Sequence, residues 1–140
     1  MENIENLNLK KFSGFGAKIS RKISITGSYS FGFPPAFYTD NGLADYSYAI
    51  LFYDENAKVI GIHFIKEREE GAFKMIPHGK DDKTSASFVA RSFFNTFKLP
   101  VDKIKGRYEP NVINQDSIGK IFLIQVKEAQ SIEIKNETLS

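Results

Sequence analysis

The chain has no cysteine and no tryptophan, and only two of its 140 residues are histidines. The absence of cysteine excludes disulfide bonds, cysteine-ligated zinc sites and thiol catalysis, and it is typical of proteins from a reducing compartment. No run of about 18 apolar residues occurs, so the sequence predicts no transmembrane helix. The polar, acidic residues 1–6 do not resemble a secretory signal, and we expect a cytoplasmic protein.

Residues that could carry catalysis are also sparse. His63 and His78 show no metal-ligand spacing, and Glu67, Glu69 and Glu70 form a charged run typical of a solvated loop. The nucleophile-elbow motif Gly-x-Ser-x-Gly does not occur in the sequence. These absences favour a non-enzymatic protein with no cofactor, no metal and no small-molecule ligand.

Phenylalanine is abundant instead, with 13 residues, and the aromatic content is 14%. Because each large aromatic ring buries about 150–250 Å², this content predicts a well-developed core. A chain of this length corresponds to one domain that needs no metal or disulfide to fold. The predicted core consists of apolar residues from the expected strands and helices: Ile23, Ile25, Phe33, Ile50, Phe52, Ile60, Ile62, Phe64, Phe73, Phe88, Phe93, Phe97, Phe122 and Ile124.

Alternating polar and apolar residues predict strands along much of the chain. Residues 46–53 and 59–65 are rich in aromatic and β-branched residues and flank a polar turn, which predicts a β-hairpin. Residues 21–26 and 120–127 also have strand patterns, whereas residues 89, 93 and 97 share one face of a predicted helix. The expected fold class is α+β, a largely antiparallel sheet of about six or seven strands with two short helices.

The positive charge is concentrated near the N-terminus, although the net charge is only +2. Residues 1–22 carry five basic and two acidic residues, whereas the remainder carries 14 basic and 15 acidic residues. The basic residues could neutralise phosphates, and Phe12 and Phe15 could stack on bases. This pattern predicts a nucleic-acid-binding site made of Lys10, Lys11, Lys18, Arg21 and Lys22. The alternative is an ordinary solvated terminus whose phenylalanines pack against the core.

The expected organisation has three parts. Residues 1–20 form a basic N-terminal arm, residues 21–128 form the single α+β domain, and residues 129–140 form a polar C-terminal tail. In this interpretation the protein is a small non-enzymatic nucleic-acid-binding or regulatory protein. It uses the arm and the first strand to bind DNA or RNA.

A series of short segments occurs in a fixed order over residues 21–66, about a third of the chain. The segments are Arg21-Lys22-Ile23-Ser24-Ile25, Phe33-Pro34, Asn41-Gly42-Leu43, Asp45 and Asp54-Glu55-Asn56. In this order they resemble the AbrB-like swapped-hairpin family of bacterial DNA-binding proteins, and the resemblance implies an interleaved dimeric barrel. Arg21 and Lys22 match the family's basic strand positions, so the resemblance implies DNA contact there.

Two alternative functions stay open at this point. Residues 46–53 are apolar on both faces of the expected strand, so that both faces must be covered. A partner chain could cover one of them, which predicts a homodimer or a protein–protein interaction domain that works by strand addition. An enzyme would instead need a deep pocket that encloses Arg107, Tyr108 and Glu109 beside a histidine.

Overall fold

The computed structural model describes residues 20–79 and 84–126, which form two five-stranded antiparallel sheets. Sheet A has the strand order β6-β7-β2-β1-β8, and sheet B has the order β5-β3-β4-β10-β9. The strands of sheet A are β1 (Ile23–Ile25), β2 (Ser30–Phe33), β6 (Ile76–His78), β7 (Ser85–Val89) and β8 (Gly106–Tyr108). The strands of sheet B are β3 (Tyr48–Asp54), β4 (Val59–Ile65), β5 (Phe73–Lys74), β9 (Asn111–Gln115) and β10 (Gly119–Gln125).

The chain passes between the two sheets at two bends. Met75 alone separates β5 from β6, and Glu109 and Pro110 separate β8 from β9. Met75 is buried and its backbone N–H donates to the Ser47 carbonyl at 2.8 Å, whereas Pro110 has no N–H to place in a ladder. Edge strands of one sheet therefore continue as edge strands of the other, which is how corners form between packed sheets.

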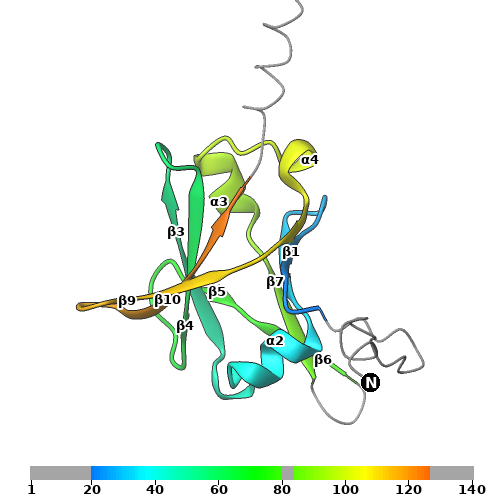
Figure 1. Ribbon diagram of the computed structural model, residues 1–140, viewed down its shortest axis with the longest axis vertical. Coiled ribbons are helices and arrows are strands. Elements are labelled where there is room, and N and C mark those ends of the chain that lie inside the picture. The colour runs from blue at the N-terminus through cyan, green and yellow to red at the C-terminus, as the bar shows by residue number, and fades with distance from the viewer. Residues whose placement is uncertain (1–19, 80–83, 127–140) are drawn as a thin grey trace, which may run out of the picture.

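Short helices lie at the two ends of the sheets (Figure 1). At one end are α3 (Arg91–Thr96) and α4 (Val101–Ile104), and at the other is α2 (Pro35–Asp40), followed by a 3-10 turn at Leu43–Asp45. Proline at the first position suits the start of α2, because its missing N–H has no partner there. Phe93 and Phe94 of α3 are both buried, so two adjacent sides of this helix pack against the core.

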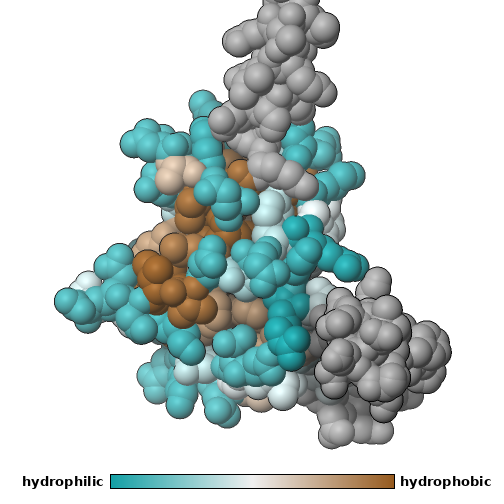
Figure 2. Space-filling view, in the orientation of Figure 1, coloured by the Kyte–Doolittle hydropathy of each residue, from teal (hydrophilic) through white to brown (hydrophobic). Residues whose placement is uncertain are grey.

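The core lies between the sheets and is built largely from aromatic rings. The Phe33 ring of sheet A meets the Phe64 ring of sheet B edge-on at 5.2 Å, and Phe37 of α2 meets Phe122 at 5.0 Å. Successive side chains of a strand point to opposite faces, so every second residue of each sheet lies outside this core. Apolar side chains gather over β9 and β10 of sheet B (Figure 2).

The expected α+β class with antiparallel strands is confirmed, but the arrangement differs in detail. The described residues contain two sheets instead of one, and three short α-helices instead of two. Short, bent strands produce the difference, because periodicity within two or three residues does not reveal a change of sheet. Within the same residues, no helix has the length and apolar character needed to cross a membrane.

Ten of the fourteen predicted core residues are buried, and four are not. Ile50 and Phe52 lie on the outer face of β3, while Phe73 and Phe97 are only partly buried against the core. The prediction was wrong for the first two because both faces of this strand are apolar, so alternation did not show that Ala49, Leu51 and Tyr53 face the core. It also missed large, fully buried residues, including Phe31, Leu43 and Ile104.

Candidate anion-binding face

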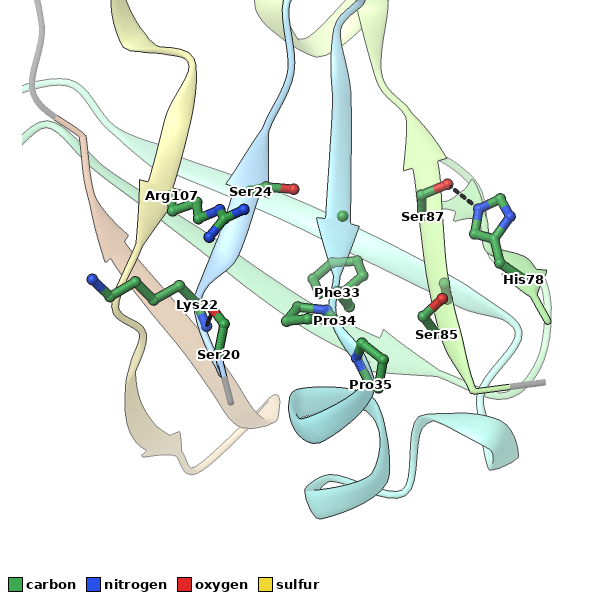
Figure 3. A pocket seen from close by; sticks show the side chains of 12 residues that line it. Ser20, Lys22, Ser24, Phe33, Pro34, Pro35, His78, Ser85, Ser87 and Arg107 are labelled. Carbon is green, nitrogen blue, oxygen red and sulfur yellow. Dashed lines mark hydrogen bonds between the residues drawn. The ribbon is translucent and has the colours of Figure 1, made fainter. Parts of the chain in front are cut away.

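A shallow hollow of about 360 Å³ lies on the outer face of sheet A, and we call it the cradle (Figure 3). Its position follows from strand register, because Gly32 of β2 pairs with Ser24 of β1 on one side and Ser87 of β7 on the other. Arg107 of β8 pairs with Ser24 and extends the same row. The cradle is lined by Ser20, Lys22, Ser24, Gly32, Phe33, Pro34, Pro35, His78, Ser85, Ala86, Ser87 and Arg107.

Gly32 leaves the middle of the cradle without a side chain. A Cβ at this position would stand 2.6 Å from the Ser24 Oγ, which is closer than real Cβ atoms approach. Ser24 and Ser87 flank Gly32 with small hydroxyl side chains, so no large side chain rises from the sheet surface along this row. The hollow is therefore a consequence of three small residues placed side by side by the register.

Among the residues that the structure describes, the charged side chains that line the cradle, Lys22 and Arg107, are both basic. Lys22, directly before β1, and Arg107 of β8 lie on one side, and His78 of β6 lies beyond β7 on the other (Figure 3). The four serines of the lining add hydroxyl groups, and within residues 20–79 and 84–126 no aspartate or glutamate belongs to the lining. Ammonium and guanidinium groups with nearby hydroxyls form charge-assisted hydrogen bonds to phosphate oxygens. The arrangement can therefore hold an anion.

His78 and Ser87 share a hydrogen bond, with 2.7 Å between Nε2 and Oγ. A serine beside a histidine is the beginning of a nucleophile–base pair, but such a pair also needs a group that orients the imidazole and donors for an oxyanion. The part of the lining that the structure describes contains no carboxylate for the first role. Both side chains can form hydrogen bonds with a bound anion.

The residues considered for an enzyme do not line one pocket. Arg107 lies in the cradle, but Tyr108 points into the core, where its hydroxyl donates to the Ile104 carbonyl. Glu109 follows β8 and is exposed. Neighbouring residues of a strand face opposite sides of the sheet, so this triplet is divided between the core and the surface.

The second histidine lies apart from the cradle, on the other sheet. His63 Nδ1 donates to the Lys120 carbonyl at 2.8 Å, beside a hollow of about 160 Å³ that Tyr46 and Phe122 also line. No group of three or more histidine, aspartate or glutamate side chains that could hold a metal ion occurs in the part of the chain that the structure describes.

The structure places the predicted nucleic-acid-binding residues in three situations. Lys22 lines the cradle. Arg21 lies outside it, and its Nε is 2.5 Å from the Asp40 Oδ2 of α2. Lys10, Lys11 and Lys18 lie outside the described residues, but Ser20, the first described residue, belongs to the cradle lining.

The sequence analysis did not predict that Arg107 lines the same hollow as Lys22. The two residues are separated by 85 positions, and only the pairing of β8 with β1 brings them together. The polar face of β7, formed by Ser85 and Ser87, was visible in the alternation, but its place beside Gly32 was not.

No family model, curated protein or solved structure matches the chain significantly. The resemblance to AbrB-like proteins therefore stays a prediction.

Proposed function

We propose that the protein is a small non-enzymatic nucleic-acid-binding protein that holds the phosphate backbone in the cradle. One observation carries the proposal: Lys22 and Arg107 share a hollow with four serines, and the described residues that line it include no carboxylate. Ser20 belongs to the same hollow, so the basic arm predicted over residues 1–20 joins the domain at the cradle. Arm and cradle would then neutralise neighbouring phosphates of one strand.

The chemistry of the cradle favours contacts to phosphate over contacts to bases. Phosphate contacts fix position and carry no sequence information, whereas base reading needs side chains at base edges or aromatic rings for stacking. Phe33, the one aromatic residue among the described residues of the lining, is buried. We therefore expect binding with little sequence preference and with a strong dependence on salt, since each phosphate contact releases counterions.

The test is a salt series with fluorescently labelled single- and double-stranded oligonucleotides, measured by anisotropy on the full chain. Lys22→Gln and Arg107→Gln should each weaken binding and lower the slope of log K against log salt by about 0.7–0.9. The matched control is Lys103→Gln, because Lys103 is equally charged, exposed and located on α4 at the far end of the molecule. This control should leave the slope unchanged.

A second comparison separates the cradle from the arm. Neutralising the arm in the intact chain, with Lys10, Lys11 and Lys18 changed to Gln, should lower the slope independently of the cradle substitutions. Absence of binding at low salt would contradict the proposal. So would equal losses for Lys22→Gln and Lys103→Gln, because binding would then follow total charge and not the cradle.

A further inference from the structure

Two serines lie on either side of the middle of the cradle. Ser24 of β1 and Ser87 of β7 each pair with Gly32 of β2, so two strand spacings separate them, about 9–10 Å. The residue between them is glycine, and no side chain fills the space above it. Hydrogen bonds of about 2.5–2.7 Å from each hydroxyl to a charged oxygen leave room for one phosphate group and not for two. The space over Gly32 therefore suits a single phosphate group that is bonded from both sides.

Both hydroxyl groups can donate to an anion at this position. The Ser24 Oγ leans over Gly32, 2.6 Å from where a Cβ would stand, and it has no hydrogen-bond partner among the described residues. The Ser87 Oγ lies 2.7 Å from the His78 Nε2. A hydroxyl group donates one hydrogen bond and accepts others, so a bond accepted from His78 leaves the Ser87 hydrogen for a ligand.

Two positive charges lie beside this position without a carboxylate partner. Lys22 and Arg107 line the same side of the cradle (Figure 3), and the only ion pair within residues 20–79 and 84–126 joins Arg21 to Asp40. A phosphodiester inside a strand carries one negative charge. A phosphate monoester carries about −1.5 to −2 charges at pH 7 and offers three acceptor oxygens. The charge of the cradle therefore matches a monoester more closely than a diester.

The cradle is bounded at one end. Pro34 and Pro35 lie at the end nearest α2, between Ser20 on one side and Ser85 on the other (Figure 3). A strand that places an internal phosphate over Gly32 has to leave the hollow in two directions. A strand end needs only one direction, so its terminal phosphate reaches Gly32 without the chain passing over the prolines.

We propose that the cradle binds the terminal phosphate of a nucleic-acid strand in preference to the phosphodiesters within the strand. The inference rests on the proposed function, because it names the part of the nucleic acid that the cradle takes. The phosphate lies over Gly32 and accepts hydrogen bonds from Ser24 and Ser87. Lys22 and Arg107 neutralise its two negative charges.

The test compares three single-stranded oligonucleotides of one sequence, with a 5′-phosphate, with a 3′-phosphate, or with hydroxyl groups at both ends. Each carries a fluorophore on an internal base, and anisotropy gives its affinity for the full chain. At least one phosphorylated oligonucleotide should bind about tenfold more tightly than the unphosphorylated one, the gain typical of a hydrogen bond to a charged group. The double variant Ser24→Ala/Ser87→Ala should bring this ratio to about one, because it removes both donors.

Ser117→Ala is the matched control, because Ser117 is an exposed serine in the turn between β9 and β10 of sheet B. It should keep the full ratio. Inorganic phosphate, added as a competitor, separates a strand end from a free phosphate. It should displace the phosphorylated oligonucleotide only at concentrations far above the Kd of that oligonucleotide, and displacement near that Kd would overturn the assignment to a strand end.

The remaining outcomes distinguish this inference from the proposed function. Equal, salt-dependent affinities for all three oligonucleotides would overturn the inference and leave phosphate-backbone binding in place. A preference that persists in the Ser24→Ala/Ser87→Ala variant would overturn it as well, because the terminal phosphate would then bind outside the cradle. Absence of binding by every oligonucleotide at low salt would overturn the proposed function and the inference together.

Discussion

The Ser24 hydroxyl lies over Gly32 of the neighbouring strand, 2.6 Å from where a Cβ on Gly32 would stand. Replacing Gly32 with alanine therefore forces Ser24 out of its rotamer, which costs about 0.5–1.5 kcal/mol. Replacing a strand glycine with alanine otherwise stabilises by about 0.5–1 kcal/mol. We expect these effects to cancel, so that Gly32→Ala leaves the free energy of unfolding nearly unchanged in urea denaturation.

The same substitution has a different expected outcome when Ser24 is already alanine. The Ser24 Cβ lies 4.0 Å from the added methyl group, an ordinary contact, so the full gain of about 0.5–1 kcal/mol should appear in that background. Equal effects in both backgrounds would show that the two side chains do not interact. In either background the methyl group fills the cradle, and oligonucleotide affinity should fall.

The ion pair between Arg21 and Asp40 leads to a second prediction. Both side chains are about half exposed, at 54% and 47%, so the pair contributes only about 0–1 kcal/mol to stability. Asp40→Asn removes the carboxylate that neutralises Arg21, one residue before Lys22. We expect tighter oligonucleotide binding and a steeper salt slope, with little change in thermal stability. Unchanged binding would mean that Arg21 lies too far from the bound strand to act.

The core beneath the cradle depends on Phe31, the fully buried residue next to Gly32. Its ring stacks on Phe88 at 5.2 Å and on Phe94 at 5.4 Å. Phe31→Ala should lower the free energy of unfolding by about 3–5 kcal/mol, because the cavity cannot close among rigid rings. Val89→Ala, at an exposed position of the same sheet, should cost less than about 0.5 kcal/mol. Similar losses for both variants, measured by urea denaturation, would contradict this packing.

Local patterns in the sequence determined where the main strands form and which residues of the first strand face the core. The aromatic and β-branched run of residues 46–53 and its partner 59–65 predicted the hairpin that β3 and β4 form. Alternation placed Ile23 and Ile25 in the core, and with them it placed Lys22 on the outer face. These features depend on neighbours within a few residues, for which strand geometry permits only two directions.

Contacts between distant strands were decided only by the tertiary structure. The register of β1 with β8 brings Arg107 beside Ser24, and the register of β2 with β7 brings Ser87 beside Gly32. A strand's own periodicity shows which face a residue occupies but not which strand lies next to it. That choice depends on how the whole core packs, including the bends at Met75 and Pro110 that carry the chain between sheets. The sequence alone therefore determined which strand faces are polar or apolar, and the tertiary packing decided which polar residues lie together in the cradle.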